Sequence, residues 1–151
     1  MEIYLIYAST SGNVEITMEY IAKNLNYMGF SPKLIRSETA SIENIIKNKK
    51  FIFGTSTWDH GKLNPFFENL AGHMQKHNLE DKQAAFVGLG DRRYEPVLFC
   101  KGIETVRDLW LEKGGEEVSV ILKIQGDPYS QLNTVVEPWV SALAKTWVYQ
   151  K

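Results

Sequence analysis

The sequence has little of several features that would mark a specialised class of protein. It contains one cysteine, Cys100, so no disulfide can form within the chain, which is usual in a reducing compartment. No apolar run approaches the length that crosses a membrane, and no secretory signal pattern precedes the first apolar segment. We therefore expect a cytoplasmic protein with no membrane-bound segment.

An excess of charge of one sign is also lacking. The 17 Lys and Arg residues nearly balance the 18 Asp and Glu residues, and the formal net charge is −1. A nonspecific nucleic-acid binder needs a clear basic excess, so we expect no nucleic-acid partner. The length of 151 residues, 44% of them hydrophobic, suits one domain, which we expect to span residues 1–151.

Short apolar segments alternate with longer amphipathic ones along the whole chain. The apolar segments at 3–8, 51–54, 84–89 and 118–124 are typical of strands, and 31–36 is a weaker, more polar strand of the kind expected at a sheet edge. The segments between them place apolar residues at helical spacing, with Ser41 and Asn64-Pro65 as helix-start signals. This alternation predicts an α/β fold with a parallel sheet, helices on both faces and a strand order that reverses within the sheet.

A hydroxyl-rich turn follows the first predicted strand and leads into the first predicted helix. Its sequence is Ser9-Thr10-Ser11-Gly12-Asn13-Val14. The unpaired N–H groups and positive dipole end of a helix start bind phosphate, hydroxyls add donors, and Gly12 lets the backbone approach an anion closely. The segment alone is equally compatible with a polar turn in which Ser11 caps the helix.

Two more polar segments follow the third and fourth predicted strands, and each contains one large aromatic residue. We predict loops at 55–62, with Trp58, and at 90–96, with Tyr94. Ligands of parallel α/β sheets bind outside the carboxyl ends of the strands, where the strand order reverses, so the three loops are expected to meet at one site. The alternative is that both aromatic rings merely close the end of the sheet.

These segments give the chain a resemblance to flavodoxins, and specifically to the short-chain group. Segment 9–13 is similar to the phosphate loop of the family, and Ser56-Thr57-Trp58 to a loop that stacks an aromatic ring on FMN. Gly90-Asp91 with Tyr94-Glu95 is similar to the loop that supplies the second ring, and 124–128 to the entry into the last helix. The segment 118–124 lacks the inserted loop of long-chain members. The resemblance implies a three-layer, doubly wound sandwich with a five-stranded parallel sheet in the order 2-1-3-4-5.

The resemblance also implies FMN as cofactor. Hydroxyl and amide groups of 9–14, with the Ser56 hydroxyl, would hold the phosphate, and Trp58 and Tyr94 would sandwich the ring. Backbone groups of 57–61 and 89–91 would bond the polar edge of the ring, with Asp91 near its pyrimidine end. The expected FMN-binding residues are Ser9, Thr10, Ser11, Gly12, Asn13, Val14, Ser56, Thr57, Trp58, Asp59, His60, Gly61, Leu89, Gly90, Asp91, Tyr94 and Phe99.

In function, the resemblance implies a monomeric, low-potential carrier that shuttles single electrons between an NAD(P)H-dependent flavodoxin reductase and acceptor enzymes. These partners would dock at the flavin edge, and no side chain would be catalytic because FMN performs the redox chemistry. One alternative is a specialised relative, such as an activator of ribonucleotide reductase or an NAD(P)H-dependent flavin reductase. Another is a binding module that has lost FMN.

The chain departs from the usual pattern of the family at three points. Val14 stands where threonine is usual, which removes one hydroxyl from the phosphate loop. Asp59 stands where glycine is usual, and a residue with a Cβ makes a backbone rearrangement beside the flavin harder. Members are usually strongly acidic, whereas the two predicted flavin loops here contain His60, Lys62, Arg92 and Arg93. We expect these cations to ease the second reduction of FMN; alternatively they face solvent and have little effect.

Two other candidates receive weaker support. His73 and His77 are four residues apart on a predicted helix and could face one metal ion, but no further ligand is placed beside them, so we expect no metal site. Cys100 is expected to pack beneath a flavin loop, because no motif brings a histidine near it to activate a nucleophile.

Overall fold

The computed structural model describes residues 1–58, 61–90 and 99–149, apart from the side chain of Trp58. Its centre is a sheet in the order β2-β1-β3-β5-β6, in which β7 also pairs with β5. The strands are β1 (Glu2–Ala8), β2 (Ser31–Arg36), β3 (Lys50–Trp58), β4 (Lys62–Leu63), β5 (Gln83–Gly90), β6 (Glu116–Glu117) and β7 (Leu122–Gln125). All pairings are parallel except that of β4 with β3.

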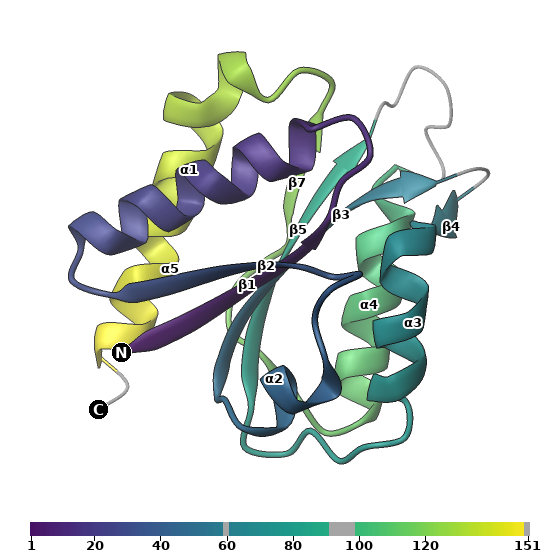
Figure 1. Cartoon of the computed structure of the whole chain (residues 1–151). Coiled ribbons are helices and arrows are strands. Elements are labelled where there is room, and N and C mark those ends of the chain that lie inside the picture. Colours follow the sequence, from purple (N-terminus) through teal and green to yellow (C-terminus); the bar gives the residue numbers. More distant parts are fainter. Residues whose placement is uncertain (59–60, 91–98, 150–151) are drawn as a thin grey trace.

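Helices cover both faces of the sheet (Figure 1). Helices α1 (Asn13–Tyr27) and α5 (Glu137–Tyr149) lie on one face, and α3 (Pro65–Met74) and α4 (Lys101–Glu112) lie on the other. The short α2 is Ile42–Ile46, and η3 (Tyr129–Gln131) and η4 (Leu132–Val136) lead into α5. Buried apolar residues accordingly form two clusters, one on each side of the sheet. The predicted three-layer sandwich and its strand order are confirmed.

The third strand is longer than the apolar pattern predicts. Residues 55–58 were expected in a loop, but Thr55 and Ser56 continue the parallel pairing with Gly88 and Leu89 of β5. Thr57 and Trp58 then pair with β4 in an antiparallel hairpin. The expectation of a loop is wrong here because β-branched threonines suit a strand, whereas the prediction followed apolar residues alone. Ser56 and Thr57 therefore stand on a strand of the central sheet.

The fifth predicted strand, 118–124, is also corrected, because it is divided into β6 and β7. Between the pairs Ala84–Glu117 and Val87–Leu122, β5 advances three residues and the edge segment five. Two residues are therefore extra, which is a bulge of a sheet edge. The indole N–H of Trp139 donates to the carbonyl of Val120 at 2.8 Å, so a side chain from α5 satisfies backbone within this bulge.

The helix starts predicted at Ser41 and at Asn64-Pro65 agree with the structure. Asn64 accepts the amide N–H of Phe66 at 2.9 Å, and Ser41 lies one residue before α2 with its own amide bonded to Asn44 at 2.8 Å. Of the apolar residues of α3, Phe66 is 42% exposed, because its neighbour Phe67 occupies the core. None of the helices within the described ranges is long and apolar enough to cross a membrane.

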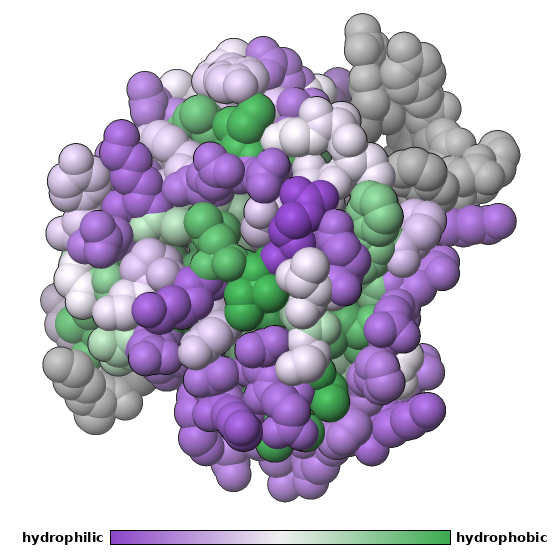
Figure 2. Space-filling view, viewed as in Figure 1, coloured by the Kyte–Doolittle hydropathy of each residue, from purple (hydrophilic) through white to green (hydrophobic). Residues whose placement is uncertain are grey.

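The edge strand β2 faces the viewer in Figure 1. In the same view, Figure 2 shows apolar side chains gathered near the middle of this face, with hydrophilic ones around them. Leu34 of β2 is 41% exposed, and the exposed Phe66 belongs to the helix beyond it. Pro32 has no N–H to donate and Lys33 adds charge, two devices that protect a sheet edge from pairing with another chain.

Candidate functional site

The turn between β1 and α1 has the backbone of an anion seat. Gly12 adopts φ 91°, and its amide N–H donates to the Ser9 hydroxyl at 3.1 Å. The first helical bond runs from the amide of Ile16 to the carbonyl of Gly12, and the helix geometry leaves the amides of 13–15 without helical acceptors. Gly12, not Ser11, occupies the N-cap, and no side chain caps the helix. The reading of this turn as a simple Ser11 cap is therefore wrong, and the helix start is open to an anion.

The carboxyl ends of β1, β3 and β5 meet around one cavity of about 290 Å³. Its walls come from all three predicted loops and from the segment after β7. The lining residues are Ser11, Asn13, Val14, Ser56, Thr57, Leu89, Gly90 and Gly126. All but Gly126 were singled out from the sequence as cofactor ligands, and the structure brings them together.

Ser56 is oriented by a residue that the sequence identified only as a helix cap. The side chain of Asn64 is fully buried and lies between Ser56 and the start of α3. Its Oδ1 accepts the amide N–H of Phe66, so its Nδ2 is the atom that donates to the Ser56 hydroxyl, at 3.3 Å. Because Ser56 Oγ accepts this bond, its own hydrogen is left for an acceptor such as a phosphate oxygen.

Thr57 has a structural partner that limits its possible role. Its Oγ1 accepts the backbone N–H of Gly102 at 3.0 Å, which joins β3 to the first turn of α4. A Cβ on Gly102 would lie 2.9 Å from the carbonyl oxygen of Ser56, so only glycine allows this close approach. The Thr57 side chain thus fixes the wall of the cavity.

The end of β5 forms the third wall. Leu89 is 4% exposed, and the carbonyl of Gly90 accepts the amide N–H of Gly126 at 2.9 Å. The ring of Phe99 lies against Gly90 and packs beside the core cluster of α3 and α4, rather than among the residues that line the cavity. Its expected contact with FMN stays a prediction.

Val14 is both part of the core and part of the cavity wall. It is 1% exposed and packs in the cluster between the sheet and helices α1 and α5. The hydroxyl one turn further on, in Thr17, is buried and donates to the carbonyl of Asn13 at 2.9 Å. Neither side chain replaces the hydroxyl that a threonine at position 14 would supply.

Several predicted ligands cannot be placed. The side chain of Trp58 and the residues Asp59, His60, Asp91 and Tyr94 lie outside the described residues. Thr10 and Ser11 are exposed in the turn before α1, and Gly61 has φ 85°. The two stacking rings and the ligands of the flavin edge therefore stay predictions.

Charged groups stand on the outer side of the turn at 9–12. The phenol of Tyr7 donates to Glu15 at 2.7 Å, and burial, together with this bond, raises the pKa of Tyr7 to about 12. The phenol consequently stays protonated and serves as a donor to the first turn of α1.

Other candidate sites have ordinary surroundings. Nδ1 of His77 lies 2.8 Å from the backbone oxygen of His73, so this ring is turned to the helix backbone. Within the described ranges, no three His, Cys, Asp or Glu side chains gather as metal ligands. Cys100 is buried in the core cluster beside α4. A larger cavity, of about 730 Å³, lies at the amino ends of the strands, with Lys49, Lys50 and Asp81 in its walls and none of the phosphate-loop residues.

Comparisons with known proteins agree with this arrangement. The family model for flavodoxin matches residues 5–139. The probable flavodoxin 2 of Bacillus subtilis (strain 168) is 32% identical over 130 residues, which are 84% of this chain and 83% of that protein. The crystal structure of oxidised flavodoxin 2 from Bacillus cereus has a TM-score of 0.89 and 28% identity, over 96% of this chain and 99% of that one.

A flavodoxin from Fusobacterium nucleatum bound to flavin mononucleotide shares the fold, with a TM-score of 0.83 and 18% identity over 95% of this chain and 97% of that one. The family match spans most of the chain, and the Bacillus subtilis relative exceeds 30% identity over more than two thirds of it. The chain therefore belongs to the flavodoxin family, the electron-transfer proteins that use FMN.

Proposed function

We propose that this flavodoxin holds FMN across the carboxyl ends of β1, β3 and β5 and exchanges single electrons with partner proteins at the exposed edge of the ring. The observation that carries the proposal is the convergence of three separate segments on one cavity beside an uncapped helix start. Bound FMN supplies the redox chemistry, and the chain supplies binding, orientation and electrostatics. No side chain is assigned a catalytic role.

The residues present suit the phosphate of FMN. The start of α1 offers amides without helical acceptors, and Gly12 permits close approach of an anion. The Ser11 hydroxyl lies in the cavity wall, and Ser56 has a hydrogen free to donate. In this proposal the phosphate accepts hydrogen bonds from these amides and hydroxyls.

The walls beyond the turn suit a flat ring. Leu89 is apolar and almost fully buried, and the neighbouring backbone of Gly90 has no side chain between it and the cavity. Trp58 and Tyr94 are proposed to stack on the two faces of the ring, since aromatic pairs add roughly 0.5–1.5 kcal/mol each beyond buried area. Backbone groups of 57–61 and 89–91 are proposed to bond its polar edge.

We further propose that residues 1–151 act as one domain and as a monomer in the cytoplasm. Pro32 and Lys33 on the open edge of β2 support the monomer, because they oppose pairing between copies. The proposed partners are an NAD(P)H-dependent reductase and acceptor enzymes that dock where the ring edge meets solvent. No nucleic-acid or membrane partner is proposed, in keeping with the net charge of −1.

The alternative functions are not favoured. A ribonucleotide reductase activator or an NAD(P)H-dependent flavin reductase would be a specialised relative, whereas the family model and the similar proteins reported above are flavodoxins. A module that has lost FMN was suggested by Val14 and Asp59, but the anion seat and the cavity are both present.

Titration of the apoprotein with FMN, followed by flavin fluorescence, tests the proposal. We expect quenching with one FMN bound per chain, and weaker binding when Ser11 and Ser56 are both changed to alanine. Ser141→Ala on α5 is the matched control and should leave the affinity unchanged. Failure of the wild-type protein to bind FMN would overturn the proposal, and steady oxidation of NADPH by the purified protein alone would indicate a flavin reductase instead.

A further inference from the structure

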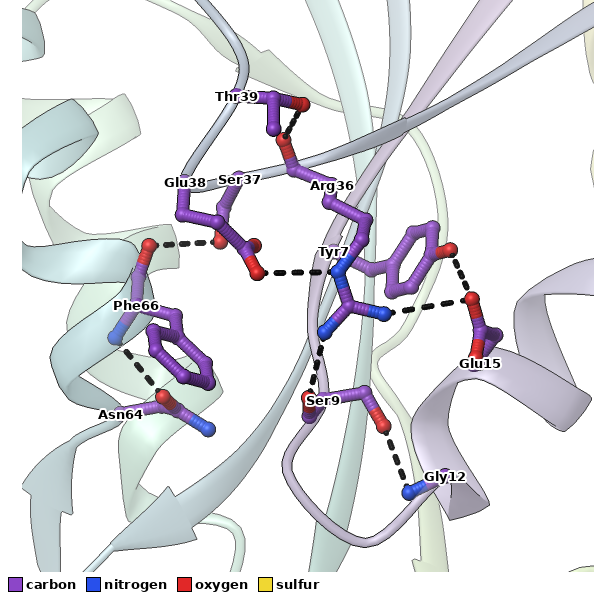
Figure 3. Close-up of polar contacts among 10 residues, drawn as sticks. All are labelled: Tyr7, Ser9, Gly12, Glu15, Arg36, Ser37, Glu38, Thr39, Asn64 and Phe66. Carbon is purple, nitrogen blue, oxygen red and sulfur yellow. Dashed lines mark hydrogen bonds and ion pairs between the residues drawn. The ribbon is translucent and has the colours of Figure 1, made fainter.

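Arg36, the last residue of β2, joins three parts of the molecule beside the phosphate-binding turn (Figure 3). One terminal nitrogen donates to the carbonyl of Ser9 at 2.7 Å, and the other lies 3.3 Å from the carboxylate of Glu15 in the first turn of α1. Its Nε donates to Glu38 at 3.0 Å. The guanidinium also lies over the ring of Tyr7, 5.6 Å from its centroid. All three nitrogens and the face of the guanidinium thus have partners.

The bond to Ser9 determines which way the next peptide faces. No cis peptide bond occurs in the described part of the chain, and in a trans peptide the C=O and the following N–H point to opposite sides. With the Ser9 carbonyl held by Arg36 on the outer side of the turn, the N–H of Thr10 points away from Arg36. The inner side of the same turn is where Ser9 Oγ receives the amide of Gly12.

The position of Arg36 is itself fixed by its neighbours. The backbone carbonyl of Arg36 accepts the hydroxyl of Thr39 at 3.0 Å, which closes the turn after β2. Ser37 is 2% exposed, its amide donates to the carbonyl of Tyr7, and its hydroxyl donates to the carbonyl of Phe66 at 2.8 Å. These bonds hold the backbone at Arg36 in place. Less conformational entropy is therefore lost when the guanidinium forms its hydrogen bonds.

We propose that Arg36 is a positioning residue for the phosphate of FMN: it holds the Ser9–Thr10 peptide and the start of α1 so that their N–H groups face the anion. The inference rests on the proposed binding of FMN at this turn. Arg36 does not touch the cofactor in this proposal and acts through Ser9 and Glu15. No pattern in the sequence indicates this role, because Arg36 is 27 residues from Ser9 along the chain.

The charge of Arg36 also favours phosphate binding at this turn. Arg36 stands between the carboxylates of Glu15 and Glu38, and Glu15 also receives the Tyr7 phenol. Without the guanidinium, two carboxylates would remain beside the turn that receives a dianionic phosphate, and their repulsion would oppose binding. Lysine would restore the charge, but a single ammonium lacks the planar fork that reaches Ser9, Glu15 and Glu38 together.

The test compares FMN with riboflavin, which has the same ring but no phosphate, in the wild-type protein and in Arg36→Gln and Arg36→Lys. We expect Arg36→Gln to raise the dissociation constant for FMN by roughly tenfold or more, since tenfold is about the lower limit for the loss of one charge-assisted hydrogen bond. The constant for riboflavin should not change. Arg36→Lys should show a smaller loss of FMN affinity, and Arg107→Gln, which removes an arginine paired with Asp108 on α4, should show none.

The outcomes separate the inference from the function that it rests on. Equal losses of FMN and riboflavin affinity would show a general structural role for Arg36 and overturn the inference, as would unchanged FMN affinity in both Arg36 variants. If Arg36→Gln does not fold, the charge-conserving Arg36→Lys variant gives the same comparison. A wild-type protein that binds riboflavin and FMN equally would show that the turn is no phosphate site, and one that binds neither would overturn the proposed function.

Discussion

Thr57 and Gly102 form a hydrogen bond of 3.0 Å between the side-chain oxygen of β3 and the backbone amide of α4. The two residues are 45 positions apart along the chain. This bond, with the close packing of Gly102 against the carbonyl of Ser56, couples the start of α4 to the wall of the proposed FMN cavity. A change at Gly102 should therefore act on both stability and binding.

Gly102→Ala should lower the free energy of unfolding by about 1–3 kcal/mol, the usual cost of overpacking a closely fitted site. The added Cβ would lie 2.9 Å from the Ser56 carbonyl, so β3 or α4 must shift, and FMN affinity should fall as well. Gly72→Ala on α3 is the control, because a Cβ there meets no atom within 4 Å. That variant should gain up to roughly 1 kcal/mol from helix propensity. Denaturant unfolding and FMN titration measure both effects, and equal behaviour of the two variants would contradict the expectation.

Tyr7 should make stability depend on pH in the alkaline range. Its folded-state pKa is raised from 10.0 to about 12, mainly by burial and then by the bond to Glu15. Below pH 10 the phenol is protonated in both states and its contribution is complete. Between pH 10 and about 12 the unfolded chain loses the proton first, so the contribution declines as pH rises through the folded pKa.

The measurement for Tyr7 is the free energy of unfolding against pH for the wild type and for Tyr7→Phe. Other groups titrate in the same range, so the difference between the two proteins isolates Tyr7. We expect this difference to be constant below pH 10 and to decline between pH 10 and about 12. A difference that stays constant across this range would show that the phenol is not held protonated by the fold.

The fold could be predicted almost entirely from the alternation of apolar segments, because buried parallel strands and amphipathic helices have distinct patterns. The prediction is wrong where polar residues form part of a strand or where a strand is interrupted. Thr55 and Thr57 suit a strand as β-branched residues, but a prediction from apolar residues alone missed them, and their pairing with β5 and β4 depends on segments distant in sequence. The bulge between β6 and β7 depends likewise on the indole of Trp139, which is 19 residues from Val120.

The cavity residues that belong to the three predicted loop segments could be predicted from the sequence. The residues that orient them could not. The sequence predicts Asn64 as a helix cap, and the structure agrees. Its second bond, to Ser56, forms only because the β3–β4 hairpin brings the two residues together. The sequence predicts Arg36 only as the end of an edge strand and Gly126 only as part of a helix entry. Their contacts were not predictable because their partners, Ser9 and Gly90, are distant in sequence.

Val14→Thr should strengthen the binding of FMN. Val14 is in the wall of the cavity beside the turn at 9–12, and threonine has nearly the same shape as valine but can donate a hydrogen bond to the phosphate of FMN bound as proposed. A hydrogen bond to a charged group is worth roughly 1.5–3 kcal/mol, so the dissociation constant should fall by roughly tenfold or more. Riboflavin serves as control, because it lacks the phosphate and its affinity should not rise. Equal or weaker FMN affinity in the variant would show that position 14 does not face the phosphate.

The basic residues of the predicted flavin loops should influence the potential of bound FMN. Fully reduced flavin is an anion, so nearby cations stabilise it and make the second reduction easier than in an acidic flavodoxin. The triple variant Lys62→Gln, Arg92→Gln, Arg93→Gln should therefore shift the second potential of bound FMN to more negative values. Because exposed charges are screened by solvent and salt, the shift should be roughly tens of millivolts and should shrink at high ionic strength.

A control variant with the same loss of charge is Lys76→Gln, Lys113→Gln, Lys145→Gln, whose residues lie in or next to α3, α4 and α5 rather than in the flavin loops. Potentiometric titration of both triple variants at low and high salt distinguishes a local effect from one of net charge. A local effect shifts only the loop variant, because a charge separated from the flavin by more than about 10 Å is largely screened at 0.1 M salt. Equal shifts in the two variants would mean that the whole surface sets the potential, and no shift in either would mean that the loop cations face solvent.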